Sequence, residues 1–365
     1  MSLFGDTNWY ETMTSQISEL ADFGWNSFFT SQLDFDPSVP ALPVRVMAVH
    51  RDRMHVAGPA IDTLIPPFVE TPDDEESTAT VGDWLLLDVG TLRPRRLLWR
   101  RSLFKRRAAG TGRKLQLIAA NVDTLFIVSS CNQDFSPARL ERYLALAREA
   151  EVTPVIVLTK ADQAGNPQDF VRPAARLLPG LLVELVDARD PESVACLLPW
   201  CARGQTVALV GSSGVGKSTL VNTLTGDGRI ATQGIREDDN KGRHTTTSRA
   251  LHRLPAGGWL LDTPGMRELQ LTDLKSGLDD VFADVVAVAQ GCRFSDCRHQ
   301  AEPGCAIQAA IATGELEADR VKRWRKLAAE EAYNSESLAD RRARSKAFGK
   351  MTRNAMNDKR ARRRE

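Results

Sequence analysis

Short apolar stretches separated by turns dominate the chain from Val44 to about Leu98. They cover residues 44–49, 53–57, 84–88 and 97–99, and the segments between them contain Gly, Pro and Asp. Several short strands in so short a region predict a small β-barrel, for which the oligonucleotide-binding (OB) barrel is one candidate.

The pattern changes beyond residue 113, where buried strands alternate with amphipathic helices. We expect strands at 123–128, 154–158, 181–186 and 207–210, with helices at 137–150 and 191–198. A polar loop at 226–248 precedes two more strands, at 249–254 and 259–261. This alternation predicts an α/β domain in which helices cover both faces of a parallel sheet.

A glycine-rich segment directly follows the strand at 206–210 and leads into a helix. Its residues are Gly211, Ser212, Ser213, Gly214, Val215, Gly216, Lys217, Ser218 and Thr219. This spacing is typical of a phosphate-binding loop, in which backbone N–H groups at a helix N-terminus point at phosphate oxygens. Lys217 would reach the outer phosphates, and the Ser218 hydroxyl would bind Mg²⁺.

Two further motifs follow strands of the same domain. Asp262 ends a strand and begins Asp-Thr-Pro-Gly265, where the carboxylate would hold Mg²⁺ through water and the Gly265 N–H would meet the γ-phosphate. Thr159-Lys160-Ala-Asp162 follows another strand. Asp162 can accept both N1–H and N2–H of guanine, and the Lys160 stem can lie against the base.

The order of these motifs resembles that of the circularly permuted GTPases. The segment Thr159–Asp162 precedes the phosphate-binding loop, whereas in ordinary GTPases the base-reading motif comes last. Together with Ile118–Asp123 at the start of the domain, this order is most similar to the bacterial ribosome small-subunit-dependent GTPase family. The resemblance extends from about Val44 to about Leu327.

The resemblance implies several further roles. Gly242–Thr247 would be the first switch, with Thr245 or Thr246 binding Mg²⁺, and the Ala188 backbone N–H would meet guanine O6. This chain departs from the family pattern at two positions, because Thr159 stands where asparagine is usual and Asp187 where serine is usual. Both departures bear on guanine affinity more than on base identity.

The catalytic group needs a separate prediction because Met266 occupies the position where many GTPases have glutamine. A methionine side chain cannot orient the attacking water. We therefore predict His244, in the switch segment, as the catalytic side chain alongside Lys217. The alternative is that His244 is an ordinary solvated loop histidine.

Near the C-terminal end, four residues have the spacing of a metal site: Cys292, Cys297, His299 and Cys305. Three thiolates and one imidazole complete a tetrahedral zinc site without an open position, which predicts a structural zinc ion. The family resemblance implies the same zinc-binding helical domain.

The charge is unevenly distributed although the net charge is only +1. Residues 1–40 contain six acids and no base, residues 93–114 ten bases and no acid, and residues 341–365 eleven bases and two acids. Two basic blocks around a nucleotide site favour a polyanionic partner, although the tail alone could be merely solvated. With neither a membrane span nor a signal peptide in the sequence, we expect a cytoplasmic protein.

These observations predict a GTPase that binds GTP/GDP, Mg²⁺ and one Zn²⁺. We expect an N-terminal extension (1–40), an OB-like barrel (41–112), a permuted GTPase domain (113–275), a zinc-binding helical domain (276–330) and a basic tail (331–365). By resemblance, it would act as a monomer on the small ribosomal subunit and its rRNA during late maturation. The alternatives are a non-enzymatic RNA-binding scaffold switched by GTP, and an ATP-dependent enzyme.

Overall fold

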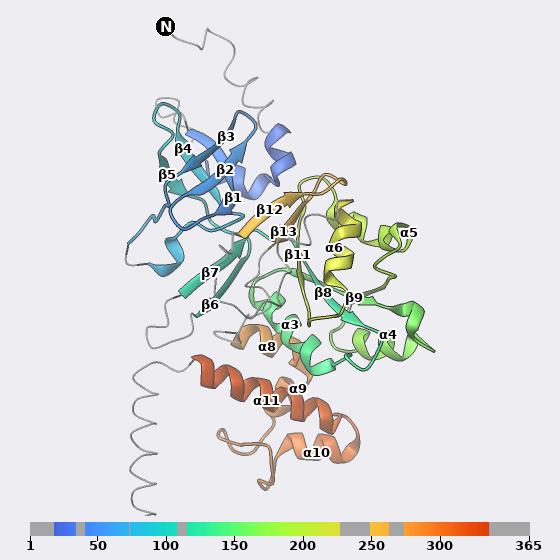
Figure 1. Ribbon diagram of the computed structural model, residues 1–365. Coiled ribbons are helices and arrows are strands. Elements are labelled where there is room, and N and C mark those ends of the chain that lie inside the picture. Colours follow the sequence, from blue (N-terminus) through green and yellow to red (C-terminus); the bar gives the residue numbers. More distant parts are fainter. Residues whose placement is uncertain are drawn as a thin grey trace, which may run out of the picture.

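The computed structural model describes residues 18–33, 41–72, 74–107, 115–226, 249–262 and 274–335. An α/β core lies between an N-terminal β-region and a group of C-terminal helices (Figure 1). One sheet of eleven strands passes through both the core and the β-region, in the order β10-β9-β8-β11-β13-β12-β1-β2-β3, with β4 and β5 joined to it through β1.

The core contributes six strands to this sheet. Five run parallel: β8 (Thr124–Ser130), β9 (Thr153–Thr159), β10 (Leu182–Leu185), β11 (Thr206–Val210) and β13 (Trp259–Asp262). All but the edge strand β10 are largely buried, as their apolar sequences predict for strands covered on both faces. The sixth, β12 (Arg249–Arg253), is antiparallel to β13. Strand β11 lies centrally, between β8 and β13.

Helices cover both faces of these strands, as the sequence predicts. On one face, Leu125 and Ile127 of β8 join a core with α3 (Pro137–Glu149) and α4 (Gln168–Ala175). The alternate residues Phe126 and Val128 face a second core, formed with α5 (Pro191–Val194), the 3₁₀ helix η4 (Ala195–Cys201) and α6 (Lys217–Thr225). The two-residue period of the strand thus separates the two cores.

The N-terminal β-region is a strongly curved antiparallel sheet. Its strands are β1 (Ala41–Val49), β2 (Met54–Gly58), β3 (Ile61–Ile65), β4 (Trp84–Asp88) and β5 (Pro94–Leu97). They enclose a core of their own that includes Val44, Val56 and Leu85. On the opposite face, Trp25 packs edge-on against Trp84 with ring centroids 4.8 Å apart.

Residues 18–33 therefore dock onto the β-region. They form the 3₁₀ helix η1 (Ala21–Phe23) and helix α2 (Ser27–Thr30). Gly24 ends η1 with φ +92°, a left-handed conformation that favours glycine.

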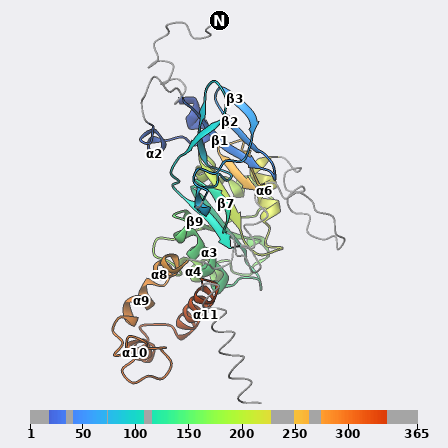
Figure 2. The same ribbon diagram turned by 90° about the vertical axis from the view of Figure 1, so that its left-hand side faces the viewer.

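The C-terminal helices join the core mainly through the first of them, which packs against α3 (Figure 2). They are α8 (Lys275–Val281), α9 (Ala283–Ala289), α10 (Ala306–Thr313) and α11 (Ala318–Ser335). The fully buried carboxylate of Glu141 on α3 accepts from Arg320 at 3.3 Å and from Arg323 at 2.7 Å, both on α11. These bonds fasten α11 to α3. Within the ranges above, no helix has the length and apolar character needed to cross a bilayer.

Some sequence predictions were wrong in detail. The strand expected at 97–99 lies earlier, at β5, and the Trp99 side chain is 73% exposed. The basic block also contains a strand, β6 (Leu103–Arg107), which pairs with β7 (Leu115–Ala120). Its Lys and Arg side chains obscured the β pattern. The helix expected at 191–198 is α5 followed by η4, with Pro199 inside η4.

Arg45 on β1 joins the β-region to the central strand of the core. Its side chain is 1% exposed and donates to the Phe23 carbonyl at 2.6 Å, the Thr206 hydroxyl at 2.8 Å and the Asn121 carbonyl at 3.2 Å. Burial lowers the pKa of Arg45 to about 10, so the guanidinium keeps its charge at neutral pH. Asp123 completes the link by accepting from the Thr206 N–H at 2.8 Å.

We predict that Arg45→Met lowers the free energy of unfolding by about 3 kcal/mol, because several buried acceptors lose their donor. Urea denaturation followed by circular dichroism measures this loss. Arg51→Met, at an exposed position in the β1–β2 turn, is the control and should change stability little. Equal stability of the two variants would contradict the proposed importance of the buried guanidinium.

Candidate nucleotide and metal sites

The predicted phosphate-binding loop connects β11 to α6, with all nine of its residues in the described part of the chain. Gly211 lies against β8: a Cβ there would stand 2.2 Å from the Val128 carbonyl oxygen. Gly216 precedes α6 with φ +96°, a conformation that favours glycine. Lys217 is buried, and its Nζ donates to the Gly211 carbonyl at 2.8 Å and to the Ser212 carbonyl.

Thr159, at the end of β9, contacts the backbone of this loop. Its fully buried hydroxyl lies 2.5 Å from the Val215 carbonyl oxygen and 3.1 Å from that of Ser129. Because the hydroxyl has one hydrogen, the shorter contact to Val215 is the better candidate for donation. The departure from asparagine at this position therefore keeps a donor toward the loop.

Three segments meet beside the loop. Lys160 has φ +57° and turns the chain into the 3₁₀ helix η3 (Ala161–Gln163), which carries Asp162. The partly exposed carboxylate of Asp162 accepts from Arg189 at 2.9 Å, so the segments 159–163 and 187–190 are in contact. The buried Ala188 offers its carbonyl to the Thr223 hydroxyl of α6 at 2.6 Å.

Arg139 is a residue near this loop that sequence analysis did not identify. It lies in the first turn of α3 and donates to the Ser212 hydroxyl at 2.6 Å and to the Asp134 carbonyl at 2.9 Å. It therefore ties the phosphate-binding loop to the turn that precedes α3. Its position 73 residues before Ser212 gives no local sequence signal.

Several predicted residues cannot be compared with the structure. His244, Thr245, Thr246, Gly265 and Met266 lie outside the described residues. Asp262 is described only as the last backbone position of β13, which runs parallel to β11. The carboxyl ends of these two strands therefore lie at the same edge of the sheet.

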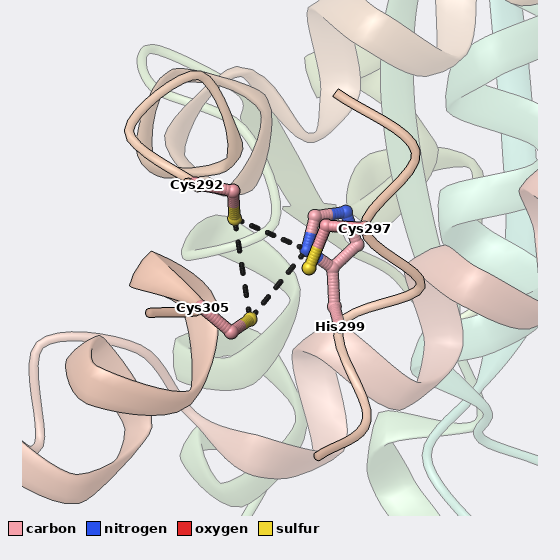
Figure 3. Close-up of side chains that lie close together, drawn as sticks. All are labelled: Cys292, Cys297, His299 and Cys305. Carbon is pink, nitrogen blue, oxygen red and sulfur yellow. Dashed lines mark hydrogen bonds between the residues drawn. The ribbon is translucent and has the colours of Figure 1, made fainter. Parts of the chain in front are cut away.

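The four predicted metal ligands form a compact cluster in the C-terminal region (Figure 3). Their ligand atoms all lie within 4.8 Å of one another, with 4.0 Å between the sulfurs of Cys292 and Cys305. His299 Nδ1 lies 3.4 Å from Cys292 Sγ and 3.7 Å from Cys305 Sγ. In a tetrahedral zinc–thiolate site the sulfurs stand about 3.8 Å apart. The cluster thus has the donor set and dimensions to hold a metal ion.

Neighbouring structure supports this cluster. Cys305 caps the N-terminus of α10, and the His299 ring lies 5.5 Å from the Trp324 ring of α11. Desolvation opposes ionisation of Cys292, but backbone N–H groups of Ala306 and Ile307 leave its pKa below the usual value for a thiol. A readily formed thiolate suits a metal ligand.

The chain order of these elements defines the class of the protein. Strand β9 and its following turn precede the phosphate-binding loop, yet the strands assemble into one sheet around β11, as in a circularly permuted P-loop GTPase. Two solved structures share the fold. YjeQ from Thermotoga maritima has a TM-score of 0.56 at 24% identity, covering 79% of this chain and 97% of its own. YloQ, described as a circularly permuted GTPase, has a TM-score of 0.55 at 21% identity, covering 84% and 100%.

The chain belongs to the RsgA GTPase family. The family's profile matches residues 97–272. "Small ribosomal subunit biogenesis GTPase RsgA 2" from Vibrio parahaemolyticus is 51% identical over 352 residues, which cover 96% of this chain and 97% of that protein. The corresponding RsgA of Mesorhizobium japonicum is 48% identical over 330 residues, covering 89% and 93%. The family predicted from the motif order is therefore confirmed, and with it GTPase activity.

We predict that Thr159→Val weakens GDP binding by about 1–3 kcal/mol, roughly 5-fold to 150-fold, because the Val215 carbonyl loses a buried donor and the loop loses its support. Fluorescence titration with a labelled GDP measures the change. Thr153→Val, at the exposed start of the same strand, is the matched control. If both variants bind GDP like the parent, Thr159 does not support the loop.

Proposed function

We propose that this GTPase acts in late maturation of the small ribosomal subunit and that the subunit stimulates its turnover. One combined observation supports the proposal most strongly. Thr159 contacts the predicted phosphate-binding loop, and Asp162 lies in the turn that follows Thr159. The chain that carries this arrangement is about half identical, over nearly its full length, to a protein named as a small ribosomal subunit biogenesis GTPase. The proposed partners are the small subunit and its rRNA. We infer a cytoplasmic monomer.

The loop residues Gly211–Thr219 would hold the phosphates, with Lys217 rotating from its carbonyl partners to the β- and γ-oxygens. Asp162 would accept from guanine N1–H and N2–H, Lys160 would lie against the base, and Ala188 N–H would meet O6. Mg²⁺, when bound, would neutralise charge between the phosphates. Its ligands would come from Ser218, from Thr245 or Thr246, and from Asp262 through water. Gly265 would contact the γ-phosphate, and His244 would orient the attacking water.

Contacts with rRNA would come from three parts of the chain. The curved sheet of β1 to β5 would serve as an OB-like barrel within residues 41–112, beside the permuted GTPase domain at 113–275. The zinc-binding helical domain at 276–330 and the basic tail at 331–365 would add further contacts. Four side chains of the basic block 93–114 pair with carboxylates: Arg95 with Asp88, Arg100 with Asp83, Arg101 with Asp123 and Lys105 with Glu76. Attraction of phosphate by this block would therefore come from its remaining Lys and Arg residues.

We assign the metal of the Cys₃His cluster as Zn²⁺. Three sulfurs and one imidazole nitrogen suit zinc, and four protein ligands leave no position for water, so the ion would be structural. The ion would lie between α9, α10 and α11 and would hold these helices together.

Purified small subunits should stimulate GTP hydrolysis, while His244→Ala should bind GTP nearly normally and lose about a hundredfold or more of the stimulated rate. Phosphate release under single-turnover conditions measures both effects. His252→Ala on β12, outside the predicted switch, is the control. Full stimulation of the His244→Ala variant by small subunits would refute the catalytic role of His244.

Two further results would favour the alternative functions. If ATP competes for the site as well as GTP does, the protein does not select guanine. If GTP binds but small subunits do not stimulate its hydrolysis, the scaffold alternative is favoured.

Cys297→Ser should release the zinc ion and loosen residues 290–327, because metal binding and local folding form one equilibrium. Metal analysis should find about one Zn²⁺ per parent chain and much less in the variant, while GDP binding should persist. Cys196→Ser, an exposed cysteine outside the cluster, is the matched control. One zinc ion retained per Cys297→Ser chain would overturn the assignment.

A further inference from the structure

Arg189 bridges two carboxylates at the predicted base pocket. Its Nε lies 3.0 Å from Asp187 Oδ1, and its Nη2 lies 3.0 Å from Asp187 Oδ2 and 2.9 Å from Asp162 Oδ2. The Arg189 backbone N–H also donates to Asp187 Oδ1, at 3.0 Å. Asp187 thus accepts two hydrogen bonds from the guanidinium of Arg189. The same guanidinium donates to Asp162, whose carboxylate is predicted to bind guanine.

The two carboxylates need such a bridge. An ionised carboxylate only accepts hydrogen bonds, so Asp187 cannot orient Asp162 by itself, whereas a serine hydroxyl at this position would be a donor. Arg189 supplies the missing donor and a positive charge between two negative groups. Among the described residues, Arg189 is the side chain whose hydrogen bonds connect the 187–190 segment with the 159–163 segment.

The bond from Arg189 leaves Asp162 able to receive a base. Each carboxylate oxygen has two lone pairs, and Nη2 occupies one of those on Oδ2. One lone pair on Oδ2 and both on Oδ1 remain for the two parallel N–H donors of guanine. A base held by both donors requires the carboxylate plane to be fixed, and one charged hydrogen bond at its edge restricts that rotation.

We propose that Arg189, held by Asp187, is a positioning residue that orients Asp162 for guanine and so sets base selectivity. This proposal deepens the proposed function, because it rests on Asp162 as the base-reading residue. Arg189 does not contact the reacting atoms. Its effect therefore belongs to nucleotide affinity and to the preference for guanine over a base that lacks the C2 amino group.

The test compares GDP with IDP, whose hypoxanthine base has N1–H but no C2 amino group. Arg189→Ala should bind GDP about 5- to 30-fold more weakly, because a freely rotating Asp162 engages one guanine donor well instead of two. IDP binding should weaken less, so the GDP-to-IDP preference should fall. Titration calorimetry of both nucleotides on the full chain measures these ratios.

Three variants separate positioning from other effects. Arg189→Lys keeps a donor and should recover much of the preference. Asp187→Ala combined with Arg189→Ala removes the unneutralised carboxylate and should bind GDP several-fold more tightly than Arg189→Ala alone. Arg176→Ala removes an exposed arginine at the end of α4 and should match the parent, since net charge alone is not the cause.

Two results would overturn the proposal: Arg189→Ala binding GDP as tightly as the parent or more tightly, or weakening GDP and IDP equally. Asp162→Asn tests the underlying function separately. It should lose GDP affinity and gain affinity for XDP, whose C2 carbonyl can accept from the asparagine amide. If Asp162→Asn leaves GDP and XDP binding unchanged, the base-reading assignment itself fails. If it switches preference while Arg189→Ala has no effect, only the positioning role fails.

Discussion

The buried hydrogen bonds at Thr206 are the constraint on which the architecture depends. Thr206 begins the strand that ends in the phosphate-binding loop, and it is held through its hydroxyl by Arg45 and through its N–H by Asp123. A buried guanidinium is stable only when its donors are satisfied, so strand β1, the Phe23 carbonyl and β11 must meet in one geometry. The position of the loop is thus linked to the N-terminal β-region.

Helix α3 forms the second link, between the loop and the C-terminal helices. Its first turn carries Arg139, which reaches Ser212, and its next turn carries Glu141 and Arg142, which pair with α11. At its far end, Glu149 accepts from the Gly277 N–H of α8. One helix therefore carries the contact to the loop at its first turn and the contacts to α11 and α8 along the rest of its length. The metal cluster contacts α11 through the ring of His299, which packs against the ring of Trp324.

Sequence analysis succeeded where the signal is local. The family prediction, which needed only the order of motifs, is confirmed. The four predicted metal ligands lie within a few turns of chain and form one cluster, and the predicted phosphate-binding segment connects a strand to a helix as expected. The roles of Arg45, Arg139 and Arg189 depend on partners 161, 73 and 27 residues away, which no local pattern reveals. Strand β6 was missed for another reason: edge-strand side chains can be charged, so a Lys/Arg run does not exclude β structure.

The pairing of β1 with β12 has a consequence for how the chain is made. Ala48 pairs with Ala250 and Val49 with Arg249. The end of β1 can therefore complete its pairing only after β12 is translated, about 200 residues later. At typical elongation rates this delay lasts on the order of 10–40 s. Until then β1 has β2 and β4 as partners but lacks one at Ala48 and Val49, and the edge of β11 that later pairs with β13 stays unpaired. Ribosomes stalled before codon 249 would therefore carry an aggregation-prone intermediate, and chaperone demand should be greatest while residues 120–250 are being synthesised.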